Sequence, residues 1–379
     1  MVYRDGKTRR DVLKATGAAV ATTGLAGMAS GSPGTIEVNV GYSDESGRRA
    51  ALSAASDVVR EFNFDALTMR VNENAIQGLQ QRPDVRYVEE NGEMHALAQQ
   101  LTWGIDRTDS EVAHANGSTG AGADVAILDT GIDSDHPDLQ ANLGSGTAFV
   151  KSRGRYAEDW DDDNDHGTHC AGIAGADDNS QGVRGVSTEA TLHAVKVLDK
   201  RGSGSFSDIA AGVEYVADQG WDVGSMSLGA SSGSAALKDA CSYAQNKGVL
   251  LVAAAGNSGP CTDCVGYPAA YPECMAVSSS ASDDSLSGFS STGPEVEIIA
   301  PGSSIYSTVP GGYDTFSGTS MATPHVAGAA GQLMANGYTN AEARSRLTST
   351  AEDLGLASNE QGAGLLDTAA ALGYDSSDN

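Results

Sequence analysis

The chain has 379 residues, enough for one large α/β domain and smaller pieces. Hydrophobic residues make up 40% of the chain, aromatic residues make up 6%, and glycines number 47, so we expect a closely packed core rich in Ala, Val and Gly. The 50 acidic residues outnumber the 23 basic residues and give a formal charge of −27, which argues against binding to nucleic acids, because phosphates must be neutralised by Lys and Arg.

The first residues predict an export signal. Arg9 and Arg10 precede a mildly apolar run from Ala15 to about Ala29. Paired arginines before a weakly hydrophobic stretch are typical of twin-arginine signals, and we assign residues 1–33 to such a signal. A membrane helix is the less favoured alternative, because the run is short and is interrupted by Gly and Thr. We therefore expect a secreted protein with no stable membrane association.

Residues 34–97 predict a small α+β domain. Strands are predicted at residues 36–42, 66–71 and 85–91, where apolar and polar residues alternate. Helices are predicted at residues 48–62 and 73–81, where the pattern is amphipathic. The resulting β-α-β-α-β order predicts a split sheet with helices on one face.

From about residue 101 onward strands alternate with helices, which indicates a doubly wound parallel sheet. The predicted strands are residues 123–129, 191–197, 223–227, 250–255, 275–279 and 297–300. The predicted helices are residues 166–175, 207–220, 235–246, 320–336 and 340–350. We therefore predict a three-layer α/β domain over residues 98–379, with a mostly parallel sheet between layers of helices.

Three polar residues at the ends of these elements indicate nucleophilic catalysis. Asp129 ends a buried strand, His166 opens a helix of small residues, and Ser320 lies in the first turn of another helix. A serine hydroxyl is weakly nucleophilic unless a base takes its proton, and the base needs an orienting carboxylate. Pro324 is compatible with a helix start, since an interior proline loses a hydrogen bond. Taken alone, this stretch has an alternative interpretation, in which Ser320 is the N-cap of a buried Ala/Gly helix.

Four motifs, in this order, resemble those of the subtilisin-like serine proteases, or subtilases. They are Asp129-Thr130-Gly131, His166-Gly167-Thr168-His169, Ala254-Ala255-Gly256-Asn257 and Gly318-Thr319-Ser320-Met321-Ala322-Thr323-Pro324-His325. The similarity runs from about Gln99 to about Leu372. Cys170 resembles a feature of the proteinase K and thermitase branches. The acidic composition and the paired arginines resemble the halolysins of salt-loving archaea, and they favour a surface adapted to molar salt over that of an ordinary soluble acidic protein.

The resemblance implies a role for each residue. Ser320 attacks the scissile carbonyl, His166 takes the serine proton and later returns it, and Asp129 orients the imidazole. Asn257 and the main-chain N–H of Ser320 would donate to the oxyanion. Without the resemblance, Asn257 would be an ordinary turn residue. His169 is the competing histidine, and we expect it to be structural.

Two segments resemble the edges that pair with an extended substrate in this family. They are Gly202-Ser203-Gly204 and Ser227-Leu228-Gly229. The primary pocket would be lined by Ala254, Ala255, Gly256 and Gly266. Small walls leave a roomy apolar pocket, so we expect broad specificity with a preference for large uncharged side chains before the cut. The alternative is that these glycines serve loop geometry alone.

A structural calcium ion is the expected cofactor, because one set of oxygen-bearing residues matches the strong calcium site of the subtilisins. The set comprises Gln99, Asp138, Asp178 or Asn179, Gln181 and Val183. The acidic run at residues 158–165 either holds a second calcium ion, as in thermitase, or is a solvated run of charges. Glu295 and Glu297 resemble a weaker cation site.

The domain at residues 34–97 resembles the inhibitory propeptide of the subtilases. The segment Tyr87-Val88-Glu89-Glu90 is the best match. We expect the propeptide to be removed by a cut between His95 and Gln99. An independent accessory domain is the alternative.

The chain has 5 cysteines, an odd number. Cys170 would be a buried free thiol, as in proteinase K. The other four allow three pairings, in a compartment that permits disulfides. We favour Cys241 with Cys274, which would join a helix to the strand beneath it, and Cys261 with Cys264, which would close a short loop.

The favoured function is a secreted, monomeric serine endopeptidase of broad specificity, made as an autoprocessed zymogen and inhibited by its own propeptide. A processing protease of narrow specificity is one alternative, which the glycine-lined cleft disfavours. A catalytically silent subtilase fold used for binding is another, which is disfavoured because no triad or oxyanion residue is missing.

Overall fold

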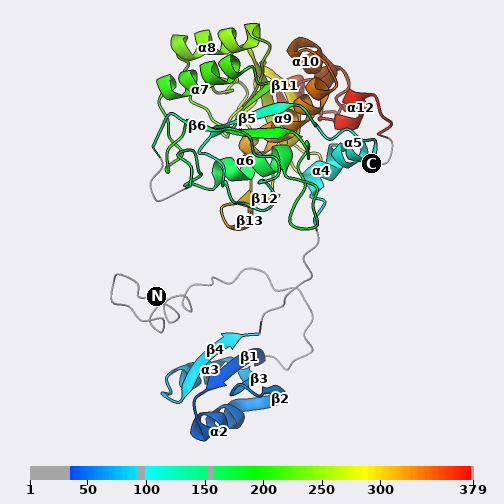
Figure 1. Cartoon of the computed structure of the whole chain (residues 1–379). Coiled ribbons are helices and arrows are strands. Elements are labelled where there is room, and N and C mark those ends of the chain that lie inside the picture. Colours follow the sequence, from blue (N-terminus) through cyan, green and yellow to red (C-terminus); the bar gives the residue numbers. More distant parts are fainter. Residues whose placement is uncertain (1–34, 92–98, 152–156, 377–379) are drawn as a thin grey trace. The chain divides into compact units, whose positions relative to one another are not determined.

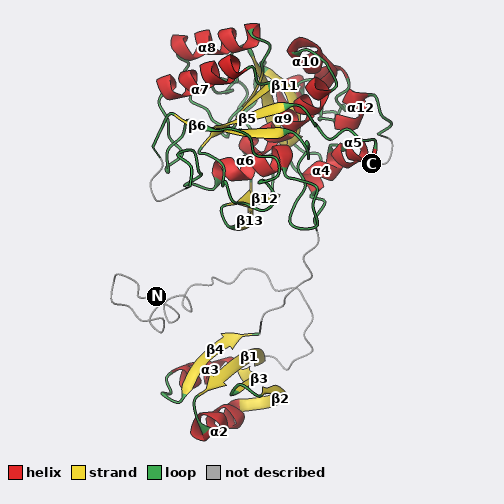
Figure 2. Cartoon of the chain, viewed as in Figure 1, coloured by secondary structure: helices red, strands yellow, loops and turns green. Residues whose placement is uncertain are grey.

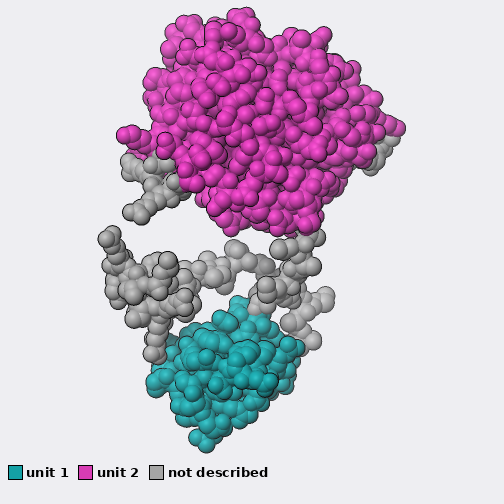
Figure 3. Space-filling model, viewed as in Figure 1, with its two compact units in different colours: residues 1–96 teal, residues 97–379 magenta. Residues whose placement is uncertain are grey.

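The computed structural model describes residues 35–91, 99–151 and 157–376 (Figure 1). The predicted export signal and most of the expected cleavage region, including His95, lie outside the described residues. The chain divides into two compact units, residues 1–96 and 97–379 (Figure 3). Each unit has a hydrophobic core of its own.

Within residues 35–91, the N-terminal unit forms a four-stranded antiparallel sheet with two helices. Its elements are β1 (Thr35–Tyr42), α2 (Glu45–Ala54), β2 (Ala55–Phe62), β3 (Ala66–Asn72), α3 (Glu73–Gln80) and β4 (Val85–Glu90). The strand order is β2-β3-β1-β4. Ala51 of α2 and Leu79 of α3 pack in the same core as Val40 and Met69 of the sheet.

The predicted helix over residues 48–62 is wrong in its second half, because α2 ends at Ala54 and the chain continues as β2. The apolar residues Ala55, Val58 and Phe62 recur with a helical spacing. β2 is an edge strand whose central residues are all exposed, so it lacks the alternation that marks a half-buried strand.

The C-terminal unit contains a sheet of seven strands, all parallel, in the order β11-β10-β9-β8-β5-β7-β6. Figure 2 shows strands of this unit lying among its helices. The strands are β5 (Asp124–Asp129), β6 (Thr147–Ala148), β7 (Thr191–Lys196), β8 (Val223–Met226), β9 (Leu250–Ala254), β10 (Cys274–Ser280) and β11 (Val296–Pro301). The helices α6 (His166–Gly175) and α9 (Thr319–Ala335) cover one face, and α7 (Phe206–Gln219) and α8 (Ala235–Asn246) cover the other. The predicted three-layer α/β fold is confirmed.

Shorter elements complete this unit. They are α4 (Trp103–Arg107), α5 (Ser110–Ala115), the hairpin of β12 (Ile305–Val309) and β13 (Gly312–Phe316), α10 (Asn340–Ser349), α11 (Ser358–Gln361) and α12 (Thr368–Leu372). Apart from α10 they were not predicted, because elements of four to six residues are too short to show a clear period. None of the helices within the described ranges is long and apolar enough to span a membrane.

The small residues of α9 allow it to pack closely against its neighbours. A Cβ atom added at Gly328 would lie 2.6 Å from Val186 Cβ and 2.8 Å from the carbonyl oxygen of Ala174 in α6. Only glycine permits this approach of one backbone to another. The packing holds the helix that begins at His166 against the helix that carries Ser320.

Candidate active site

Asp129 and His166 meet where β5 ends and α6 begins. Asp129 is completely buried, and its Oδ1 accepts hydrogen bonds from Thr130 N at 2.7 Å and from His166 Nδ1 at 2.8 Å. A carboxylate bound to Nδ1 leaves Nε2 as the nitrogen that can act as a base. Burial is the largest single influence and lowers the pKa of His166, but the charges and hydrogen bonds of Asp129 and Cys170 together outweigh burial and hold this pKa well above its ordinary value of 6.5.

Ser320 lies in the first turn of α9, beside the helix that carries His166. Its carbonyl oxygen is 3.4 Å from Cys170 Sγ, which in turn lies 4.0 Å from His166 Nδ1. The Ser320 hydroxyl donates to the main-chain carbonyl of Ser227 at 3.3 Å. Rotation about the Cα–Cβ bond of Ser320 would direct this hydroxyl away from that carbonyl. The structure therefore gathers the three predicted catalytic residues from β5, α6 and α9.

The competing histidine faces a different part of the fold. His169 Nε2 lies 3.1 Å from the carbonyl oxygen of Ile305 and 3.2 Å from that of Asp314. Burial lowers the pKa of His169 to about 4, so the ring is neutral at pH 7. The ring also stacks on Phe316 at 4.4 Å. His169 therefore anchors α6 to the β12–β13 hairpin.

Asn257 is oriented by the residue that precedes Ser320. Its Oδ1 accepts from Thr319 N at 2.9 Å and from Thr319 Oγ1 at 3.0 Å. Thr319 Oγ1 accepts in turn from Gly256 N at 3.1 Å. Because both Thr319 groups donate, they must face the oxygen of the amide, and the NH₂ end of Asn257 is left for an incoming oxyanion.

Asp162 is a buried residue of the site whose role was missed in the sequence. Its carboxylate accepts from Thr130 Oγ1, from the main-chain N–H groups of Asn164 and Asp165, and from both N and Oγ1 of Thr168. These bonds tie the end of β5 to the start of α6. Asp162 therefore holds in register the two elements that carry Asp129 and His166.

The acidic run at residues 158–165 is not simply a solvated run of charges. Asp161 and Asp162 are buried, and the side chains of Asp163 and Lys196 form a completely buried ion pair at 2.7 Å. Lys196 Nζ also donates to the carbonyl oxygen of Thr130. Asp161 accepts from the main-chain N–H of Glu158 in the same run and from that of Ser134, in the loop after β5. A sequence pattern of consecutive acidic residues carries no signal that distinguishes this burial from exposure.

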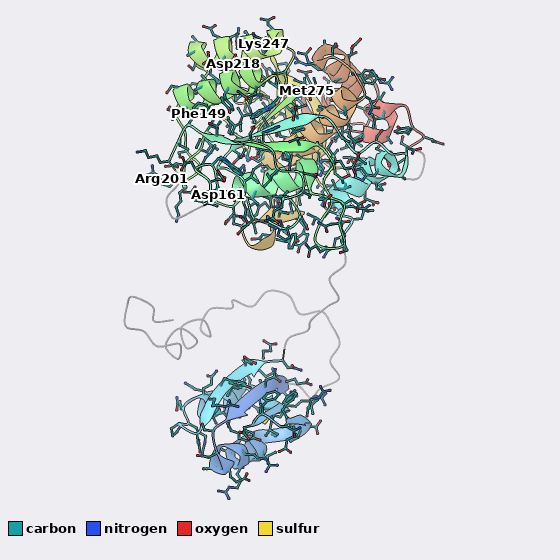
Figure 4. The ribbon with its side chains drawn as sticks, in the orientation of Figure 1. Phe149, Asp161, Arg201, Asp218, Lys247 and Met275 are labelled. Carbon is teal, nitrogen blue, oxygen red and sulfur yellow. A yellow bond between two sulfur atoms is a disulfide. The ribbon has the colours of Figure 1, made fainter. Side chains whose placement is uncertain are left out.

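A cleft of about 650 Å³ runs past His166. It is lined by both predicted substrate edges, Gly202, Ser203, Gly204, Ser227, Leu228 and Gly229. Apolar side chains that were not predicted complete its walls, namely Leu198, Phe206, Ile209, Leu237 and Tyr267. Arg201, at the rim, is largely exposed and pairs with Asp199 at 3.2 Å (Figure 4). The cleft can accept an extended chain with apolar side chains.

The residues predicted for the primary pocket lie together, but not on this cleft. Gly266 N donates to the carbonyl oxygen of Ala255 at 2.8 Å, and Gly256 directly precedes Asn257. Ala254 and Ala255 are buried. None of these residues is among those that line the cleft of about 650 Å³ in the described part of the chain.

The predicted calcium ligands largely converge. Gln99 Nε2 lies 2.7 Å from the carbonyl oxygen of Asp177 and 3.2 Å from that of Val183. Asn179 Nδ2 lies 3.1 Å from Asp138 Oδ1. A half-turn of either amide about its last bond would present oxygen instead of nitrogen, so the cluster offers carboxylate, amide and carbonyl oxygens of the kind that calcium prefers.

Two of the candidate cation ligands are paired with arginines instead. Asp178 is paired with Arg184 at 3.6 Å and its side chain is half-exposed, so Asn179 is the better candidate. Gln181 belongs to the same loop, and its N–H donates to Asn179 Oδ1 at 2.7 Å. Glu297 is held in an ion pair by Arg344, which argues against the weaker cation site expected there.

The cysteines follow the prediction only in part. Cys261 and Cys264 form a disulfide, and Cys170 is a buried free thiol, as predicted. The predicted disulfide between Cys241 and Cys274 is absent, and both are buried free thiols. A hydrogen bond with Cys241, together with burial, raises the pKa of the Cys274 thiol. The two residues thus meet between α8 and β10 as predicted, but without a covalent bond.

A parallel α/β sheet with a buried aspartate, a histidine and a serine gathered at one end defines a hydrolase of the nucleophile–base–acid class. The chain matches the Subtilase family over residues 120–364 and belongs to that family. It is therefore a subtilisin-like serine endopeptidase.

Three relatives indicate the extent of the similarity. Subtilisin E of Bacillus subtilis (strain 168) is 45% identical over 304 residues, covering 79% of this chain and 78% of the relative. An alkaline protease of Shouchella clausii is 42% identical over 319 residues, covering 83% of this chain and 81% of the relative. The subtilisin of Bacillus pumilus is 46% identical over 279 residues, covering 72% and 99%.

Proposed function

We propose that Asp129, His166 and Ser320 form the catalytic triad of a secreted endopeptidase of broad specificity. The observation that carries this proposal is the 2.8 Å hydrogen bond between buried Asp129 and His166, beside the serine of α9. The raised pKa of His166 supports its role as the base.

The geometry supports hydrolysis through an acyl-enzyme. Ser320 Oγ forms a bond to the scissile carbonyl carbon while its proton passes to His166 Nε2. The carbon–nitrogen bond then breaks, and His166 returns the proton to the leaving amine. A water molecule repeats the sequence on the acyl-enzyme and frees Ser320. Asp129 remains ionised throughout and stabilises the imidazolium.

The tetrahedral intermediates carry a negative oxygen that requires fixed donors. The NH₂ group of Asn257 and the main-chain N–H of Ser320 are the proposed donors. Thr319 supports this assignment, because its two donors orient the amide of Asn257. Donors that are already in place are not reorganised during the reaction.

Hydrolysis of casein in molar salt tests the activity and its breadth. We expect casein to be cut at many sites and a sulfonyl fluoride directed at serine to block the cutting. Among synthetic peptides, Phe or Leu before the cut should give kcat/KM about tenfold or more above Lys or Glu, because the cleft is largely apolar. Cutting of a single sequence would favour a processing protease instead, and no cutting would favour a silent binding fold.

The cluster around Asp138 is the proposed site of a structural calcium ion. Gln99, Asp138, Asn179 and the carbonyl oxygens of Asp177 and Val183 would hold it, with Gln181 as a further ligand. A calcium ion there would hold the segment after the proposed cut site to the loop that follows α6. Its contribution would be to stability rather than to the chemistry.

Asp138→Asn is expected to abolish stabilisation by calcium. Calcium at about 100 times its Kd should stabilise the wild type by about 2.7 kcal/mol, which corresponds to about 5–10 °C in Tm. The measurement is Tm of the inhibited mature enzyme with calcium and with a chelator. Asp178→Asn, a half-exposed carboxylate in the same loop, is the matched control and should keep the full shift. A full calcium shift in Asp138→Asn would contradict the site.

The N-terminal unit is the proposed inhibitory propeptide, and residues 1–33 are the proposed twin-arginine signal. The compact core of residues 35–91 supports a unit that folds as a domain. The charge of −27 supports a surface that works in molar salt. The mature enzyme would act as a monomer on polypeptides, after removal of the propeptide by its own active site.

A further inference from the structure

A proline inside α9 leaves one main-chain carbonyl of the helix without its usual partner. α9 begins at Thr319, and Pro324 lies inside it. In an α-helix the N–H of residue 324 would donate to the carbonyl oxygen of Ser320, four residues earlier. Proline has no N–H, so the carbonyl group of Ser320, the proposed nucleophile, needs a donor from elsewhere.

Two side chains from other elements supply that donor. Ser227 Oγ donates to the carbonyl oxygen of Ser320 at 2.7 Å, and Cys170 Sγ donates at 3.4 Å. Both side chains are buried, Ser227 just after β8 and Cys170 on α6. A thiol is a weak donor, so the Ser227 hydroxyl is the main partner.

We propose that the Ser227 side chain is a positioning residue for the nucleophile, through the carbonyl that Pro324 leaves free. This inference rests on the proposed role of Ser320. The direction of the Ser320 carbonyl sets the main-chain torsion angle ψ of Ser320. A change in this angle also changes the direction of the Ser320 side chain. A buried carbonyl that loses its donor turns towards another one. A shift of the nucleophile by a fraction of an ångström then lowers the rate of attack.

The contact between the two residues is reciprocal. The Ser227 hydroxyl donates to the Ser320 carbonyl, and the Ser320 hydroxyl donates to the Ser227 carbonyl at 3.3 Å. Ser227 also begins one of the two segments that line the cleft. A single residue thus connects the nucleophile to the proposed substrate edge. Cys170 adds a second, weaker connection, from the helix that carries His166.

The test compares Ser227→Ala with Ser227→Thr, which keeps the hydroxyl. Both are assayed in molar salt with a chromogenic peptide, and the rate is divided by the number of active sites titrated with a sulfonyl fluoride. We expect Ser227→Ala to lower kcat about tenfold with KM changed less than about twofold, and Ser227→Thr to stay within about threefold of the wild type. A merely structural role would lower Tm or the number of active sites, but not kcat per site.

Pro324→Ala gives an independent arm, because it restores an N–H that can donate to the Ser320 carbonyl. In the Pro324→Ala background, Ser227→Ala should lower kcat about threefold or less.

The inference is overturned if Ser227→Ala leaves kcat per site unchanged, raises only KM, or lowers kcat by the same factor with and without Pro324. If Ser227→Ala does not fold, Ser227→Cys replaces it, and its weaker donor is expected to lower kcat per site about threefold below that of the wild type; an unchanged kcat per site would overturn the inference. Ser320→Ala is assayed in the same way. Residual activity of Ser320→Ala would refute the triad itself. An inactive Ser320→Ala together with a fully active Ser227→Ala would refute only the positioning role.

Discussion

Ser320→Ala is expected to lower kcat by about 10⁶ and to leave the chain at full length. The size is that of the loss measured for the same change in subtilisin, a relative of this chain. Without the Ser320 hydroxyl the chain cannot form the acyl-enzyme. Only substrate binding and the oxyanion donors then remain to contribute to catalysis. Because we propose that the propeptide is removed by the same active site, maturation should stop as well.

The measurement follows the size of each expressed chain together with its rate on a peptide substrate. Wild type should lose about the first quarter of the chain, up to the region between His95 and Gln99. Ser242→Ala, which removes a serine hydroxyl from α8, is the matched control and should mature normally. Maturation of Ser320→Ala without any added protease would show that autoprocessing is wrong.

Asp129→Asn is expected to lower kcat by about 10⁴ and to move the pH profile. The loss is of the size seen when the aspartate of such triads is replaced, including that of subtilisin. In the wild type His166 works only when neutral and its pKa lies above 6.5, so kcat/KM should rise with pH through a pKa above 6.5. Asparagine carries no charge to offset burial, so the pKa of His166 should fall.

The acid limb of the residual activity in Asp129→Asn should therefore lie at lower pH than in the wild type. Asp165→Asn is the matched control, because Asp165 precedes His166 directly yet accepts no hydrogen bond from the imidazole within the described structure. Its acid limb should stay close to that of the wild type. An acid limb that does not move in Asp129→Asn would mean that the carboxylate does not control the charge of His166.

The proposed catalytic residues could be picked out in the sequence because their chemistry requires particular residue types at the ends of elements. Asp129 ends a buried strand and His166 opens a helix, and both positions are visible in the pattern of apolar and small residues. The layers of the fold followed from the same alternation of strands and helices. Gly328 shows why α9 is built of small residues, although the contact with α6 could not be read in advance.

What could not be predicted depends on burial that sequence patterns do not show. Asp162 and Lys196 have the residue types of a solvated surface, yet both are buried next to the site. β2 has helical spacing because an exposed edge strand does not need to alternate. Cys241 and Cys274 were correctly placed side by side, but proximity alone did not determine whether the two thiols are bonded.

The position of a covalent inhibitor tests the triad most directly. Wild-type enzyme is treated in molar salt with a sulfonyl fluoride until activity is lost, and the labelled peptide is identified by mass spectrometry. We predict one label per chain, on the oxygen of Ser320, and no label when His166 is replaced by alanine. Complete inactivation with the label on another residue, or labelling of Ser320 at the wild-type rate without His166, would contradict the triad.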